Sequence, residues 1–147
     1  MQCKSGADHI QSLHDGRSVY LDGEPVHNVA THPAFRNAVA SAAWLYDFQS
    51  RPENLELMTF VPEGTSRRVN RCWQMPRSYG ELVERRQALQ SWARLSYGFV
   101  GRSPDHVASA IIGQRMGIEV FERHGPARAK ALADYVDYAT NNDLFLT

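Results

Sequence analysis

The sequence predicts a mainly α-helical domain that carries one or two short β-hairpins. Apolar residues recur at intervals of three and four along three long stretches, which is the spacing of one face of an α-helix. Several stretches begin at Ser, Thr or Pro and end near Gly, the residues that commonly start and stop helices. The pair Asp22-Gly23 lies between β-forming residues and is typical of a hairpin turn.

Length and charge limit the class of protein. The 147 residues suit one domain, and 43% apolar and 22% charged residues are ordinary values for a globular chain. Because 16 basic residues are balanced by 16 acidic ones, we do not expect a nucleic-acid-binding protein. No apolar run is long enough to span a membrane, and Cys3 and Cys72 are isolated from each other. We therefore expect a cytoplasmic protein without a membrane segment.

The first half of the chain alternates helices with short extended segments. Thr31 and Pro33 mark a helix start, since Thr caps helices and Pro fits their first turn. In order, the expected elements are a helix over 7–14, strands over 18–21 and 24–26, a helix from Thr31 to about Gln49, and either a second hairpin or an extended arm over 57–61 and 69–73.

The second half is expected to hold three helices. Ser78 and Glu81 form a capping box at the start of a helix over 78–99, with an apolar face of Leu82, Leu89, Trp92 and Leu95 and with Arg85 on the polar side. Ser103-Pro104 begins the next helix, whose apolar stripe is Val107, Ile111, Gln114, Ile118 and Phe121. The last helix covers 127–140, and the helical domain as a whole covers residues 1–143.

The segment between Gly98 and His106 carries the strongest candidate site. Gly98 and Gly101 permit a tight turn, and the helix that follows offers free N–H groups and a partial positive charge. Arg102 stands just before that helix and His106 in its first turn, which makes a pocket for an anion beside a titratable imidazole. The spacing is equally compatible with a plain helix–helix corner that has a surface Arg and a partly buried His.

Other patterns are less informative. The remaining histidines have no metal-ligand spacing, so no metal is expected, and no Gly-rich phosphate loop or Gly-x-Ser-x-Gly motif is present. The three tryptophans are interpreted as core residues. Tyr135 and Tyr138, near the end of the last helix, either face a ligand or pack against neighbours.

Three ordered blocks of sequence resemble one known family. They are S-L-H-D-G-R-S-V-Y at 12–20, T-H-P-A-F-R at 31–36 with L-Y-D at 45–47, and W-A-R-L-S-Y-G with G-R-S-P-D-H within 92–106. On these blocks the chain resembles the oxygenase component of the 4-hydroxyphenylacetate 3-monooxygenase family. The resemblance implies a fold like that of acyl-CoA dehydrogenases, in which this chain corresponds to the N-terminal helical domain. Residues 144–147 then form either the start of a missing β-domain or an unrelated tail.

The same resemblance implies a two-component, reduced-FAD-dependent monooxygenase. A separate flavin reductase would supply reduced FAD, and one oxygen atom would be added ortho to the hydroxyl of a phenol. The expected substrates are 4-hydroxyphenylacetate, a chlorophenol or a tyrosine-derived phenol, and the full-length protein is expected to be a homo-oligomer. The family's substrate-binding Arg falls on Arg102, where a guanidinium favours the phenolate form of the substrate.

Two further positions follow from the resemblance. The family often has Tyr at the position of His106 and His at the position aligned with Tyr138, so the polar pair is exchanged here. We therefore expect Arg102 and His106 to be catalytic and Arg102, His106 and Tyr138 to bind substrate, while no flavin-binding residue is assigned. A related dehydratase branch requires cysteines near this helix start, and Cys72 is remote in sequence. The alternative to an enzyme is a truncated, non-catalytic helical interaction module or a gene remnant.

Overall fold

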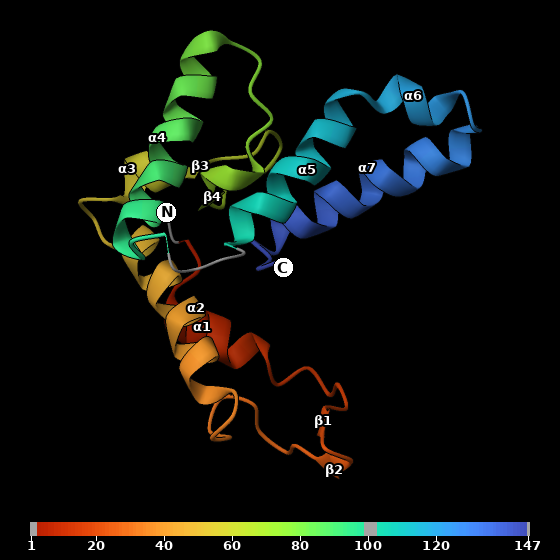
Figure 1. Cartoon of the computed structure of the whole chain (residues 1–147). Coiled ribbons are helices and arrows are strands. Elements are labelled where there is room, and N and C mark those ends of the chain that lie inside the picture. The colour runs from red at the N-terminus through yellow and green to blue at the C-terminus, as the bar shows by residue number, and fades with distance from the viewer. Residues whose placement is uncertain (1–2, 99–102, 147) are drawn as a thin grey trace.

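The computed structural model describes residues 3–98 and 103–146 and confirms a mainly helical fold with two small hairpins (Figure 1). The described elements are α1 (Gly6–Ser12), β1 (Tyr20–Leu21), β2 (Glu24–Pro25), α2 (Arg36–Ser50), α3 (Leu55–Met58), β3 (Thr59–Phe60), β4 (Val69–Asn70), the 3-10 helix η1 (Arg71–Trp73), α4 (Tyr79–Leu95), α5 (Pro104–Met116), α6 (Ile118–Glu122) and α7 (Pro126–Asn141).

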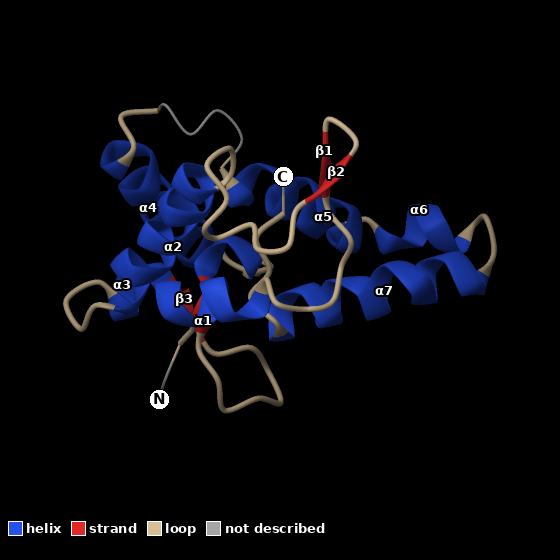
Figure 2. Ribbon diagram, turned by 90° about the horizontal axis from the view of Figure 1, so that it is seen from below, coloured by secondary structure: helices blue, strands red, loops and turns tan. Residues whose placement is uncertain are grey.

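The helices form two groups that meet at η1. Helix α1 packs on α2, and α4 packs on α3 and η1. Helices α5, α6 and α7 form a hairpin that contacts η1 and then reaches away from the other helices (Figures 1 and 2). The β1–β2 hairpin projects from the body as well (Figure 2). The core lies where η1 is enclosed between α4 and the α5–α7 hairpin.

Both hairpins are confirmed, although their strands are shorter than expected. Asp22 and Gly23 have φ angles of 52° and 86°, so the turn between β1 and β2 has the two left-handed residues that its sequence predicts. Strands β3 and β4 pair through Thr59 with Asn70, which makes the second segment a hairpin and excludes the extended arm. The strand β4 ends at Asn70. The Asn70 side-chain oxygen accepts a hydrogen bond from the Cys72 N–H at 2.7 Å and thereby caps the first turn of η1.

Two expected helix starts are wrong in detail. Helix α2 begins at Arg36, five residues after Thr31, because the His32 carbonyl and ring nitrogen accept backbone N–H groups and hold residues 31–35 in turns. At α4, Ser78 accepts the Glu81 N–H as predicted. The Glu81 carboxylate, however, accepts the N–H of Arg77 in place of that of Ser78, so only half of the capping box forms.

The helix expected over 103–121 is two helices. It breaks at Gly117 into α5 and α6, and Ser103 caps α5 without a side-chain hydrogen bond. The buried face of α5 consists of Pro104, Ala108 and Ile112, one position away from the predicted stripe. In the same way, α4 ends at Leu95 and buries Arg85, Ala88 and Trp92, while Leu82 is 51% exposed.

Small residues explain these rotated faces. Ala88, Ala108 and Ala139 are each completely buried, and they belong to α4, α5 and α7. Alanine lets helices approach closely, so the contact forms where the side chains are short rather than where they are most apolar. The larger members of the core cluster are Leu45, Met58, Trp73, Trp92, Ile112 and Val136. Trp44 is 42% exposed, so its assignment to the core was wrong.

A buried polar cluster joins the end of the chain to α2 and β4. The Asp143 carboxylate accepts hydrogen bonds from Gln49 Nε2 at 2.8 Å and from the Asn70 N–H at 3.1 Å. Gln49 Oε1 in turn accepts from Asn70 Nδ2 at 2.6 Å, and the Tyr46 hydroxyl donates to the Asp143 carbonyl at 2.7 Å. The chain after α7 is therefore held on the core, where residues 144–146 also pack.

Glycine is required where α1 meets α2. The Gly6 N–H donates to Asp47 Oδ1 at 2.8 Å. A Cβ atom at Gly6 would lie 2.5 Å from the Ala43 carbonyl oxygen, closer than any real contact of that kind. Any larger residue at this position would separate the two helices.

We predict that titration of Asp143 and titration of His9 change the free energy of unfolding in opposite directions as the pH rises. Burial raises the pKa of the Asp143 carboxyl from 3.8 to about 6, so the folded state holds that proton more tightly and stability falls as the pH rises through this range. Burial lowers the pKa of the His9 imidazole from 6.5 to about 4, so stability rises with pH between these values. Chemical denaturation should therefore find the two slopes largely cancelling in the native sequence.

Single variants separate the two contributions. In Asp143→Asn, the free energy of unfolding should rise between about pH 4 and 6, because only the His9 contribution remains. The Asp143 contribution, which decreases with pH by at most about 3 kcal/mol, is lost. His9→Phe keeps a ring against Tyr46 and should leave a stability that falls. Asp134→Asn on the exposed face of α7 is the control and should match the native profile. Identical slopes in all four proteins would contradict the assignment.

Candidate functional site

The turn from α4 into α5 is only partly described. Tyr97 and Gly98 have φ angles of 51° and 76°, so the chain leaves α4 through two left-handed residues. Gly101 and Arg102 lie outside the described residues, so the predicted position of the Arg102 guanidinium is not tested by the structure.

His106 and Tyr138 both lie on the outer side of the α5–α7 hairpin. His106 is exposed in the first turn of α5, where its N–H donates to the Ser103 carbonyl at 3.0 Å. Tyr138 is 59% exposed near the end of α7. Among the described residues no hydrogen bond joins the two side chains. Within this domain they face away from the core, and any site that uses them is open to the surroundings.

Arg85, which the sequence pattern places on the polar side of its helix, is buried in the first half of α4. It is 9% exposed, and its Nη2 donates to the Cys72 carbonyl and to Ser109 Oγ, both at 2.8 Å. Its Nε is buried and has no hydrogen-bond partner within the described part of the chain, and burial lowers the pKa of the guanidinium. Arg85 therefore links α4, η1 and the beginning of α5. No feature of the sequence separates it from its exposed neighbour Arg86.

Arg71 is a second buried guanidinium, and its partners show a structural role. Nη1 donates to Gln74 Oε1 and Glu84 Oε2, both at 3.0 Å. Nε and Nη2 donate to the carbonyls of Leu57 and Glu56 at 3.0 and 2.7 Å. Arg71 thus joins η1 to α3 and α4 with its donors in use.

Cys72 is remote from α5 in sequence but not in space. Element η1 packs directly on α5, and Cys72 belongs to the same core cluster as Ala108 and Ile112. Its thiol is 1% exposed, and burial raises the pKa of that thiol well above the ordinary value. Over residues 3–98 and 103–146, no group of His, Cys, Asp and Glu is arranged to hold a metal ion. Cys72 is therefore a core residue.

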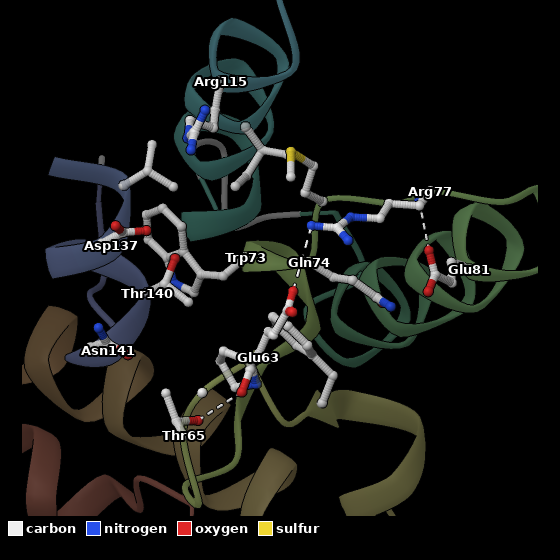
Figure 3. A pocket seen from close by; sticks show the side chains of 16 residues that line it. Glu63, Thr65, Trp73, Gln74, Arg77, Glu81, Arg115, Asp137, Thr140 and Asn141 are labelled. Carbon is white, nitrogen blue, oxygen red and sulfur yellow. Dashed lines mark hydrogen bonds and ion pairs between the residues drawn. The ribbon is translucent and has the colours of Figure 1, made fainter. Parts of the chain in front are cut away.

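Two hollows adjoin α5, and Arg77 and Ile112 line both of them. The first, about 580 Å³, lies between the β3–β4 loop and helices α5 and α7, with Trp73 at its floor (Figure 3). Its rim carries charges of both signs, from Glu63, Arg77, Glu81, Arg115 and Asp137. The second, about 450 Å³, lies between α4 and α5 and is lined in part by Arg85 and Ser109. Neither hollow is lined by His106 or Tyr138.

No described helix combines the length and the apolar character that crossing a lipid bilayer requires.

Comparison with known proteins identifies the class of protein that shares this fold. The family profile described as "4-hydroxyphenylacetate 3-hydroxylase N terminal" matches residues 5–147. A crystal structure of the oxygenase component of 4-hydroxyphenylacetate 3-monooxygenase, complexed with FAD and 4-hydroxyphenylacetate, superposes with a TM-score of 0.85 and 31% identity over 97% of this chain and 29% of that one. The fold is thus that of the N-terminal helical part of this class of oxygenase.

The relatives give the particular family. The oxygenase component of 4-hydroxyphenylacetate 3-monooxygenase from Geobacillus sp. (strain PA-9) is 37% identical over 148 residues, which cover 100% of this chain and 30% of the relative. The oxygenase component of 4-nitrophenol 2-monooxygenase from Rhodococcus sp. is 40% identical over 133 residues, 89% of this chain and 25% of the relative. This chain belongs to the 4-hydroxyphenylacetate 3-hydroxylase family, and it spans about 30% of the length of the Geobacillus relative.

The dehydratase branch shares this fold. A 4-hydroxybutyryl-CoA dehydratase from N. maritimus superposes with a TM-score of 0.74 and 25% identity over 97% of this chain. The helical scaffold around α5 is therefore common to both kinds of protein.

We predict that His106 and Tyr138 contribute little to the stability of this chain. Because both side chains point outward, His106→Phe and Tyr138→Phe should change the free energy of unfolding by less than about 0.5 kcal/mol. Ile112→Ala, at a site that is 3% exposed, is the contrasting variant and should cost about 2–5 kcal/mol. Urea denaturation distinguishes the two classes, and a large loss in either outward variant would show that it packs in the core.

Proposed function

We propose that this chain is the N-terminal part of a two-component, reduced-FAD-dependent monooxygenase that hydroxylates phenols ortho to the hydroxyl. The observation that carries the proposal is the family match across residues 5–147, together with the likeness to an oxygenase component that binds FAD and 4-hydroxyphenylacetate. Because the chain spans under a third of these relatives, the activity is assigned to a longer protein that contains it.

Three residues of this chain hold the phenol in the proposed site. The Arg102 guanidinium lies near the ring oxygen and favours the phenolate, which is the more reactive form toward an electrophilic oxygen atom. His106 or Tyr138 takes or relays the phenol proton. The outward position of both side chains supports a site that is completed by protein beyond this domain.

The described residues do not by themselves fit a flavin dinucleotide. Their hollows are open at the surface, and neither of the two beside α5 contains a glycine-rich phosphate-binding turn. We therefore assign the binding of FAD to the remainder of the longer protein and give this chain the task of positioning the phenol. A separate flavin reductase and self-association of the full-length protein belong to the same proposal.

The proposed substrate is 4-hydroxyphenylacetate, a chlorophenol or a tyrosine-derived phenol, and the residues of the site favour the latter two. His106 stands where the family often has Tyr, which changes the group beside the ring oxygen. The 4-nitrophenol 2-monooxygenase among the relatives supports the view that the scaffold accepts other phenols. Two buried free thiols support a reducing, cytoplasmic location.

The proposal is tested by hydroxylation with the longer protein. With a flavin reductase, NADH and FAD, it should convert at least one member of a panel of para- and chloro-substituted phenols to the catechol, measured by chromatography. The 147-residue chain under the same conditions should give no catechol, because it lacks a flavin site. Absence of product from the longer protein across the panel, or turnover by the 147 residues alone, would contradict the proposal.

Variants test the individual residues. In the longer protein, Arg102→Ala should lower kcat/KM about 10- to 150-fold, the effect of losing a charge-assisted contact of roughly 1.5–3 kcal/mol. Arg128→Ala, on the exposed first turn of α7, is the matched control and should leave the rate unchanged. His106→Phe should alter the acidic limb of the pH–rate profile if His106 accepts the proton, because a proton acceptor stops acting once it is itself protonated. An unchanged rate in Arg102→Ala would remove that residue from the site.

A further inference from the structure

The hollow between α4 and α5 has a composition unlike that of its neighbour. It measures about 450 Å³, within the range of small-molecule sites, and we call it the Arg85 hollow. The residues that matter for its chemistry are Arg77, Leu82, Arg85, Ser109, Gly113 and Met116. Leu82 and Met116 are 51% and 53% exposed, so they form apolar walls that no other described residue covers.

The charge of the Arg85 hollow is uncompensated. None of its lining residues is acidic, whereas the neighbouring hollow is lined by three carboxylates and two guanidinium groups. Arg77 lies at the rim, and its Nη2 is 3.7 Å from Oε2 of Glu63, which lines the neighbouring hollow (Figure 3). The cation that belongs to the Arg85 hollow is therefore Arg85.

Arg85 is more than nine-tenths buried but makes hydrogen bonds only to neutral acceptors. Nη2 is bound to the Cys72 carbonyl and to Ser109 Oγ, and the buried Nε has no acceptor among the described residues. Asp105, in the first turn of α5, acts on the guanidinium only through space and forms no ion pair with it. A buried charge that no carboxylate pairs with directly is costly, and an anion in the hollow would offset that cost.

Two neighbouring groups add donors at the same place. Ser109 Oγ accepts from Arg85, which leaves its own hydroxyl hydrogen for another acceptor. Tyr79, which also lines the hollow, is the first residue of the 17-residue helix α4, whose N-terminal end carries a partial positive charge. The polar end of the hollow therefore offers donors and positive charge, and the other end offers apolar surface.

We propose that the Arg85 hollow binds a small monocarboxylate with an apolar body, with the carboxylate at Arg85 and Ser109 and the body over Leu82 and Met116. This site is separate from the proposed phenol site because His106 and Tyr138 do not line it. It goes beyond the proposed function and does not depend on it.

Hexanoate tests the proposal, with hexanamide as its neutral counterpart. Neither probe is a phenol, so binding at the phenol site is not measured. Calorimetric titration of the 147-residue chain should show saturable binding of hexanoate with a Kd on the order of 1 mM, as expected for about eight non-hydrogen atoms. Hexanamide should bind at least about 10-fold more weakly, since it lacks the charge that Arg85 requires.

Gly113 offers a variant that fills the hollow without disturbing the fold. A Cβ atom there would have no heavy atom within 4 Å, so Gly113→Leu should extend into the open space. Leu is also a better helix former than Gly, so the thermal midpoint should stay level or rise. Gly113→Leu should weaken hexanoate binding at least about 10-fold, whereas the matched control Gly113→Ala should bind nearly as well as the native chain.

Arg85→Gln provides an independent variant. It should reduce the affinity for hexanoate to that for hexanamide, and circular dichroism should confirm that it remains folded. The proposal is overturned by any of three results: no saturation with hexanoate below about 50 mM, equal affinity for the acid and the amide, or unchanged affinity in folded Gly113→Leu.

Discussion

The arrangement of the domain depends on the hydrogen bonds that the buried carboxylate of Asp143 accepts. Asp143 is 3% exposed, and it accepts hydrogen bonds from α2 and from the end of β4, segments that lie 94 and 73 residues away in sequence. A buried carboxylate that lost these donors would be strongly unfavourable, so the cluster specifies one arrangement of α2, β4 and the chain after α7. The α5–α7 hairpin is thereby anchored just beyond the end of α7.

Buried guanidinium groups provide the second set of constraints, around η1. Arg71 joins η1 to α3 and α4, and Arg85 joins η1 to α4 and α5. Their donors meet backbone carbonyls as well as side chains, so they fix helix positions rather than only neutralise charge. These buried groups hold the helices together from within, while His106 on α5 and Tyr138 on α7 are exposed at the surface of the domain.

Local signals in the sequence were accurate where the structure depends on neighbouring residues. Asp22-Gly23 forms its left-handed turn, Ser78 caps α4, and Gly98 follows the end of that helix. Predictions failed where distant residues compete. Thr31 does not begin α2, because His32 gathers the nearby N–H groups. Of the candidate site residues, the outward positions of His106 and Tyr138 are now known, while Arg102 lies outside the described residues.

The sequence by itself determined the helical class, the first hairpin and the family, because turns, caps and ordered motifs consist of consecutive residues. The structure decided that the second extended segment is a hairpin. Tertiary structure alone decided which face of each helix is buried, since Ala88, Ala108 and Ala139 set the contacts. It also decided that Asp143 and Arg85 are core residues. Burial of a charged side chain depends on donors and acceptors that come from remote segments of the chain. A local pattern of residues therefore does not predict it.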